Sequence, residues 1–170
     1  KRYKFECVLI FLRTYYLQQI EKEIDLTENE QSLISALAHQ CFLNEYVFFQ
    51  SNTDCNFIDQ LKQKIEKLET IQQEHISSIL LYACYAPLTS LSNHKLLLKL
   101  KSSSDIEDLL TLQIREPLEE QKLNNSIQSL GEINNEISQT VRQQYEENPY
   151  PRWKAESVFQ PFHTRELSKE

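Results

Sequence analysis

The chain of 170 residues contains a single glycine, Gly131. Glycine reaches positive φ at little steric cost, so tight hairpin turns and phosphate-binding loops depend on it. A Rossmann-type dinucleotide loop needs two or three glycines in one turn, and a P-loop needs at least two. The nucleophile elbow of α/β-hydrolases needs two glycines around its serine. The sequence therefore excludes all three kinds of site.

The composition favours helices. Leu, Ile, Gln, Glu and Lys dominate the sequence, hairpin dipeptides such as Asn-Gly are missing, and apolar residues recur at helical spacing. We predict an all-α fold of about seven helices, in an irregular bundle or an array of stacked hairpins. We expect residues 1–147 to form this domain and residues 148–170 to form an extended Pro/aromatic strap and tail. No residue period repeats, so a solenoid is not favoured.

The predicted helices at the start of the chain are long. The first spans about residues 3–24, with Arg13 and Lys22 outside its apolar face. Thr27 and Glu30 form a capping box that opens a second helix, which we expect to run to about residue 50. This second helix is apolar on most sides, which predicts a central position in the fold.

The later predicted helices are shorter. Asp54 is expected to cap an amphipathic helix, and another apolar helix is expected to start near Gln72 and to be broken by Pro87. Ser104 and Glu107 predict a second capping box, and Pro117 either kinks the helix that follows or begins a new one. After a polar connector over residues 124–135, a last helix carries apolar residues at a spacing of four: Ile133, Ile137, Val141 and Tyr145.

Charge and cysteine content limit the kind of environment and partner. The net charge of −7 argues against non-specific nucleic-acid binding, which needs a basic surface. No apolar run is long enough for a membrane span. The four cysteines are widely spaced, which favours reduced thiols and a cytoplasmic location. The sequence contains no methionine, and we expect it to be a segment of a longer protein.

Candidate catalytic and metal-binding residues are few. His39, Cys41, Cys55 and Cys84 could be imagined as zinc ligands, but the short cysteine pairs of structural zinc sites are absent. Cys41 with His75 could be imagined as a nucleophile and its base. We interpret these residues instead as core or surface positions, and we expect no catalytic, cofactor-binding or metal site in this chain.

Two polar clusters leave alternatives open. Asn44, Glu45 and Tyr46 lie on the most buried-looking helix, where they either lie at its solvent edge or cap a neighbouring helix, or else line an interface or groove. Arg115 either belongs to a solvated face with an Arg–Glu pair or is buried and locks helices together.

One segment near the C-terminus combines the residue types of protein interfaces. Two tyrosines, the single tryptophan, two prolines and an arginine fall between Tyr145 and Trp153. Prolines fix an extended backbone, and Tyr, Trp and Arg dominate interface hot spots. The segment is either an arm packed back on the helices or a docking strap. The docking residues would be Tyr145, Asn148, Pro149, Tyr150, Pro151, Arg152 and Trp153.

Ordered blocks of the sequence resemble one protein family. Residues 145–153 read Tyr-Glu-Glu-Asn-Pro-Tyr-Pro-Arg-Trp. They resemble a signature of bacterial tetratricopeptide-repeat proteins that carry a class I S-adenosylmethionine-dependent methyltransferase domain. Blocks at residues 36–48, 85–88, 115–120 and 137–142 resemble the same family in the same order. At Gly131-Glu132 this chain departs from the Thr-Pro expected there.

The resemblance implies that this chain is the helical region upstream of a methyltransferase domain, because no glycine-rich loop follows Trp153 within it. S-adenosylmethionine is implied for that further domain and not for these residues. The expected function is a non-catalytic scaffold that positions the domain, with the domain as its partner. The alternative is a free-standing helical protein–protein interaction module, able to form a homodimer, whose surfaces would be the groove at residues 44–49 and the stripe at residues 133–145.

Overall fold

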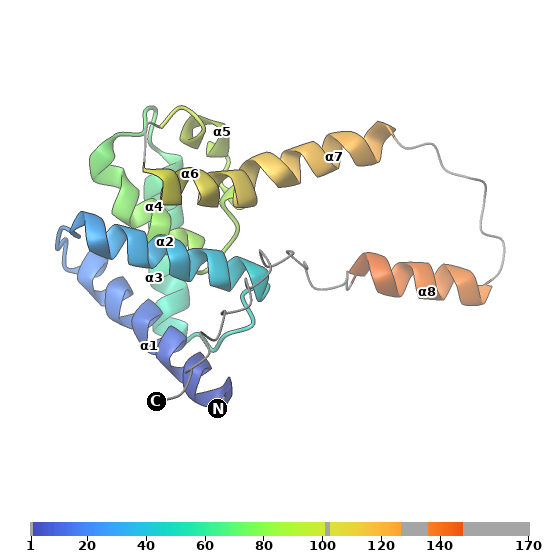
Figure 1. Ribbon diagram of the computed structural model, residues 1–170, viewed down its shortest axis with the longest axis horizontal. Helices are drawn as coiled ribbons and strands as arrows, with labels where there is room; N and C mark the ends of the chain where they lie inside the picture. The colour runs from blue at the N-terminus through green and yellow to red at the C-terminus, as the bar shows by residue number, and fades with distance from the viewer. Residues whose placement is uncertain (1, 101–102, 127–135, 148–170) are drawn as a thin grey trace, which may run out of the picture. The chain divides into compact units, whose positions relative to one another are not determined.

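The computed structural model describes residues 2–100, 103–126 and 136–147, and these are helical or lie in turns and short connections (Figure 1). The chain divides into two compact units, residues 1–132 and 133–170. The all-α prediction is confirmed, and the described part holds seven helices when the unbroken run of α6 and α7 is taken as one. The elements are α1 (Arg2–Glu21), α2 (Glu28–Leu43), α3 (Asn52–Glu66), η1 (Gln73–His75), α4 (Ile76–Ala83), η2 (Leu88–Ser90), α5 (His94–Leu97), α6 (Ser104–Leu110), η3 (Thr111–Arg115), α7 (Glu116–Ser126) and α8 (Glu136–Glu147).

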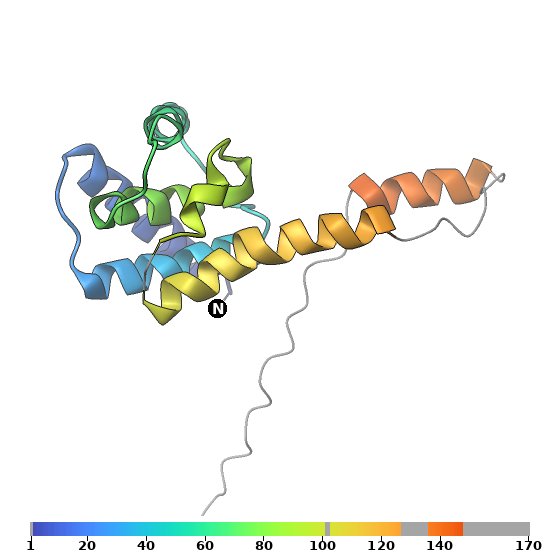
Figure 2. The ribbon, with the colours of Figure 1, turned by 90° about the horizontal axis from the view of Figure 1, so that it is seen from above.

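The core of the first unit is built around α2 and α4. α2 packs most extensively against α4 and α6, and α4 also contacts α1 and α3. Ile34, Ala38 and Cys41 of α2 are completely buried, and so are Leu81 and Ala83 of α4. The predicted central position of the second helix is therefore confirmed. Figures 1 and 2 show α2 running alongside α6.

Two helices end in Schellman motifs without glycine. After α1, the Ile24 N–H donates to Gln19 O and the Glu23 N–H to Ile20 O, with Glu23 at φ 56°. After α2, the Tyr46 N–H donates to Cys41 O and the Glu45 N–H to Phe42 O. Glycine usually takes the left-handed position of this motif. In both helices here, a glutamate takes it instead.

Several predicted helix ends need correction. α2 stops at Leu43 and does not reach residue 50, because the Schellman motif turns the chain there. Ser51 caps α3, while Asp54 is the third residue of the box and accepts a hydrogen bond from the Ser51 N–H. The predicted Ser104–Glu107 box is wrong, since the Ser104 hydroxyl donates to Asp105 Oδ1. The Thr27–Glu30 capping box is confirmed.

One long helix is formed by α6, η3 and α7, and it contains a π-helical stretch. The Glu116 N–H donates to Thr111 O, a bond one residue wider than in an α-helix. Proline lacks an N–H and its ring clashes with the carbonyl four residues earlier, so Pro117 favours such a widening in the turn before it. The stretch also brings three consecutive residues inward, because Leu112, Gln113 and Ile114 are all buried.

Candidate functional site

The predicted groove residues form the turn after α2. Asn44 ends the helix, and Glu45 and Tyr46 both have positive φ, at 51° and 58°. Two successive non-glycine residues in this region store backbone strain, and such strain persists where surrounding contacts hold it. The three side chains after the turn point to opposite sides of the chain. Val47 is 82% exposed and Phe49 is 74% exposed, whereas Phe48 packs against the core.

Phe48 is held by a buried arginine. The guanidinium carbon of Arg13, on α1, lies 5.3 Å from the centre of the Phe48 ring and 4.0 Å from that of Tyr85. These are cation–π distances. Arg13 is only 1% exposed, so its predicted place outside the apolar face is wrong. It shares the buried stripe of Leu9, Tyr16 and Leu17 because its guanidinium has two aromatic faces to cover it.

The charge of Arg13 has no hydrogen-bonded counterion among the described residues. Neither Nε nor the two terminal nitrogens makes a hydrogen bond of ordinary geometry within this part of the chain, although the Cys41 thiol and the Tyr85 hydroxyl lie close enough to interact with the guanidinium. A buried cation without an acceptor is costly, and the aromatic faces supply its electrostatic compensation here. Arg13 therefore joins α1, the turn after α2 and the end of α4 at one point.

Two buried thiols lie beside this cation. Cys41 and Cys84 are free cysteines, both completely buried. Burial raises the pKa of the Cys84 thiol well above its ordinary value. The pKa of Cys41 is lowered, first by a hydrogen bond with the Cys84 side chain and then by the positive charge of Arg13. Burial likewise raises the pKa of the Tyr85 hydroxyl, and Arg13 offsets only part of that rise.

The imagined zinc and nucleophile sets are only partly brought together. Cys41 and Cys84 are neighbours, but Cys55 is exposed and its thiol donates to Gln50 Oε1. The His75 ring accepts a hydrogen bond from the N–H of Gln72, the residue that caps η1, so the bonding of His75 is local. No group of three potential metal ligands lies together in the residues that the structure describes.

Arg115 belongs to a solvated face. Its side chain is 44% exposed and pairs with Glu107 at 2.9 Å, and it also donates to the Thr111 hydroxyl. The alternative of a buried Arg115 that locks helices together is therefore wrong. The buried arginine that joins elements is Arg13.

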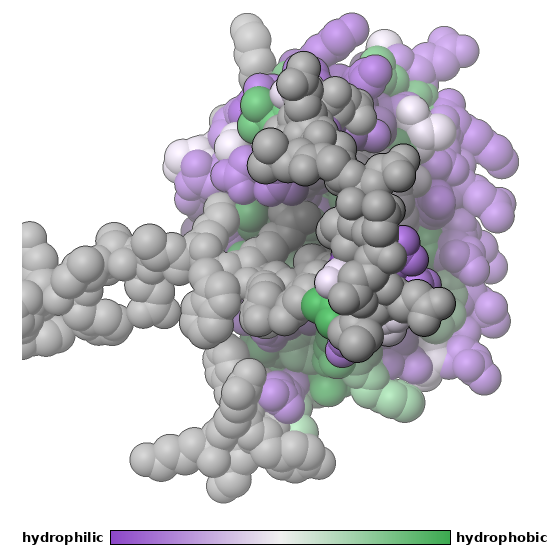
Figure 3. All heavy atoms as spheres, turned by 90° about the vertical axis from the view of Figure 1, so that its right-hand side faces the viewer, coloured by the Kyte–Doolittle hydropathy of each residue, from purple (hydrophilic) through white to green (hydrophobic). Residues whose placement is uncertain are grey.

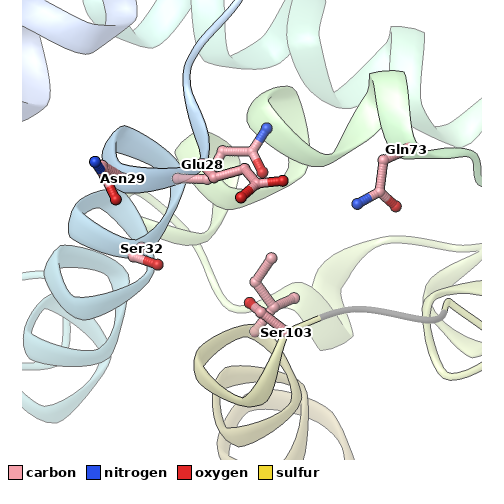
Figure 4. Close-up of a pocket in the computed structure, with 7 residues that line it drawn as sticks. Glu28, Asn29, Ser32, Gln73 and Ser103 are labelled. Carbon is pink, nitrogen blue, oxygen red and sulfur yellow. The ribbon is translucent and has the colours of Figure 1, made fainter.

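Pockets among the described residues lie away from the turn, and two of them differ clearly in character. A polar pocket of about 430 Å³ lies where α2 and α6 begin and η1 passes, and Glu28, Gln73 and Ser103 lie around it (Figure 4). A smaller apolar groove of about 220 Å³ runs between α1 and α2, lined chiefly by Leu9, Leu12, Leu33 and Leu37. Neither of these two pockets is lined by a cysteine or by more than one carboxylate.

The predicted docking residues lie outside the described residues, apart from the backbone of Tyr145 at the end of α8. The sequence reasoning did not identify Arg13, Phe48 or Tyr85. A signal was present for Arg13, because it follows Leu9 by four residues and precedes Leu17 by four, the spacing of one helix face. Only its charge argued against burial.

Comparisons with protein-family models, with curated proteins and with solved structures each returned no match. Among the described helices, none is both long and apolar enough to cross a membrane.

Proposed function

We propose that this chain is a non-catalytic helical module that positions a methyltransferase-like domain located beyond it in a longer protein. The segment Val47–Phe49 would be part of the contact surface. One observation carries the proposal. The Arg13 guanidinium contacts the Phe48 ring on the core side of this segment, while the side chains of Val47 and Phe49 are exposed. A rigid apolar pair costs little entropy to bury against a partner.

The chemistry of the site supports binding more than catalysis. The thiol with the lowered pKa, Cys41, is completely buried, so a substrate could reach it only if the core opened. A catalytic nucleophile needs a neighbouring base and access to substrate. The turn offers exposed apolar side chains instead, which are typical of contact surfaces.

The resemblance to the methyltransferase family adds a second segment, the Tyr145–Trp153 strap, to the proposed contacts. The turn lies in the block that resembles the family's Asn-Glu-Tyr-Val stretch, and the sequence of the Tyr145–Trp153 strap resembles the family's signature. We infer that the turn and the strap both contact the downstream domain. S-adenosylmethionine would bind that domain and not this chain, and the cytoplasmic location remains part of the same proposal.

The proposal is tested in the longer protein with paired variants. Val47→Ser with Phe49→Ser, and separately Tyr150→Ala with Trp153→Ala, should each lower methyl transfer while leaving S-adenosylmethionine affinity unchanged. Leu123→Ser is the matched control, because Leu123 is 54% exposed on α7. Unchanged methyl transfer in both pairs of variants would contradict the docking surface.

A second measurement addresses the non-catalytic role. Titration calorimetry of this chain with S-adenosylmethionine should show no binding, because the described residues offer no glycine-rich loop. Tight binding by the chain alone would overturn the proposal.

The alternative function, a free-standing interaction module, is favoured by the exposed apolar side chains of Val8, Phe11 and Tyr15 on α1. The coding sequence downstream of Glu170 discriminates the two. A predicted strand followed by a glycine-rich loop within roughly one hundred residues, a length typical of one domain, would favour the scaffold function. A stop codon favours the interaction module.

A further inference from the structure

The core of the first unit holds two thiols side by side. Cys41 on α2 and Cys84 at the end of α4 are completely buried, beneath a surface whose described part is mostly hydrophilic on the face shown in Figure 3. They belong to the two helices of this unit that pack most extensively on each other. Cys7 and Cys55, in contrast, are exposed. The fold therefore separates the four cysteines into one buried pair and two surface thiols.

Hydrogen bonds fix the place of the Cys84 sulfur between the two helices. Its thiol donates to Ile34 O on α2 at 3.7 Å and to Leu80 O on α4 at 3.5 Å. Ile34 and Cys41 lie on the buried face of α2, about two turns apart. A helical side chain leans toward the N-terminus of its helix, so Cys41 reaches back toward the turn that Cys84 contacts. The two thiol side chains are hydrogen-bonded to each other.

The two thiols have different electrostatic surroundings. Burial raises the pKa of Cys84 well above its ordinary value, which keeps that thiol protonated. The hydrogen bond with Cys84 and the nearby charge of Arg13 lower the pKa of Cys41. The thiolate is the nucleophilic form of cysteine, and a neighbouring cation stabilises it. Cys41 is therefore the better attacking sulfur, and Cys84 is placed to react with whatever forms on Cys41.

We propose that Cys41 and Cys84 are a peroxide-sensitive pair whose reversible disulfide ties α2 to the end of α4. The Cys41 sulfur attacks one oxygen of hydrogen peroxide, so that an S–O bond forms and the O–O bond breaks. The proton of Cys41 leaves with the other oxygen as water. The Cys84 sulfur then attacks the sulfenic sulfur of Cys41, so that the S–S bond forms and the S–O bond breaks. The hydroxyl leaves with the Cys84 proton as a second water. The two thiols together lose two electrons, which the peroxide gains.

Burial selects the oxidant. Hydrogen peroxide is little larger than water and can enter a core through small local openings. Oxidised glutathione is a tripeptide disulfide, and it would reach Cys41 only if α2 and α4 separated. Because the second thiol is already in contact, the sulfenic acid is consumed before it is oxidised further. The pair is independent of the Val47–Phe49 surface, so either proposal can fail without the other.

The first test is disulfide formation in a chain without its surface thiols. Cys7→Ser with Cys55→Ser leaves only the buried pair. Hydrogen peroxide should lower the intact mass by about 2 Da, and dithiothreitol should restore it. Oxidised glutathione should leave the mass of the folded chain unchanged. With Cys84→Ser added, peroxide should instead add about 16 Da, because the sulfenic acid has no thiol to react with. A buried pair that stays reduced while peroxide oxidises Cys55 of the parent chain would overturn the proposal.

The second test asks whether the buried cation activates Cys41. Arg13→Met, in the same background, should slow disulfide formation roughly tenfold, because less of Cys41 is thiolate. Arg115→Met is the matched control, since Arg115 lies on a solvated face, and it should leave the rate unchanged. Circular dichroism checks that both variants fold. Equal rates in the two variants would contradict the assignment of Cys41 as the attacking sulfur.

The third test is the tie between the helices. A disulfide restricts the unfolded chain, so the oxidised chain should unfold at a higher urea concentration than the reduced chain. Dithiothreitol should return the midpoint to that of the reduced chain. A midpoint that does not rise on oxidation would show that the disulfide does not hold α2 to α4 in the folded state.

Discussion

Glu45 occupies a backbone conformation that glycine normally takes at the end of a helix. Its φ of 51° lies in the left-handed region, where a Cβ crowds the following carbonyl. The chain accepts this cost because the hydrogen bonds from the Glu45 and Tyr46 N–H groups close the last turn of α2. The same solution recurs at Glu23.

Replacing Glu45 with glycine should therefore stabilise the protein. We expect Glu45→Gly to raise the free energy of unfolding by about 1 kcal/mol, since glycine adopts the left-handed region without the Cβ clash. Urea unfolding followed by circular dichroism measures this change. Gln63→Gly, in the exposed interior of α3, is the control and should lower stability by about 1 kcal/mol. A loss of stability in both variants would show that Glu45 makes a contact that outweighs the strain.

At the scale of elements, Gln113 ties three segments together. Its Oε1 accepts from the Leu88 N–H at 3.1 Å, and its Nε2 donates to Ala83 O at 3.2 Å and to Ala38 O at 3.4 Å. These groups belong to the start of η2, to α4 and to α2. The π-helical stretch allows this position to point inward beside Leu112 and Ile114, so the irregularity before Pro117 serves to join the helices.

Gln113→Leu should destabilise the protein by about 2–4 kcal/mol, because it leaves one buried N–H and two buried carbonyls without their partner. The midpoint of chemical unfolding measures the loss. Gln60→Leu, at an exposed position of α3, should change stability by less than about 0.5 kcal/mol. If the two variants behaved alike, water would be able to replace the Gln113 side chain, and the three segments would be held by apolar packing alone.

For the first unit as a whole, Arg13 is the point at which distant parts of the chain meet. It brings α1 together with Phe48 after α2 and Tyr85 after α4. A planar, weakly hydrated guanidinium can lie against aromatic rings in a dry interior, which a compact ammonium does poorly.

Arg13→Lys should therefore be more damaging than Arg13→Met. We expect the lysine variant to lose about 2 kcal/mol of stability or more, because it buries a more strongly hydrated charge and loses the planar stacking. The methionine variant keeps most of the volume without any charge and should stay within about 1 kcal/mol of the parent chain. Thermal and urea unfolding of both variants provide the comparison. A more stable lysine variant would indicate an acceptor for the charge outside the described residues.

The sequence by itself determined the class of structure and several of its local features. One glycine in 170 residues and an excess of helix formers led to an all-α fold, and the Thr27–Glu30 capping box set the start of α2. These features are local, because propensity and capping depend on residues within one turn of one another. The prediction stopped being accurate at Asp54 and Ser104, where several neighbouring side chains could have served as caps.

Only the tertiary structure decided which face of α1 is buried. Both faces carry apolar residues at helical spacing, and charge alone placed Arg13 outside the apolar face. The structure reverses that, with Arg13 at 1% exposure and Phe11 at 66%. The physical reason is that the cost of burying a cation depends on what covers it. Phe48 and Tyr85, which cover Arg13, reach it from remote parts of the chain, so no local pattern in α1 could reveal them.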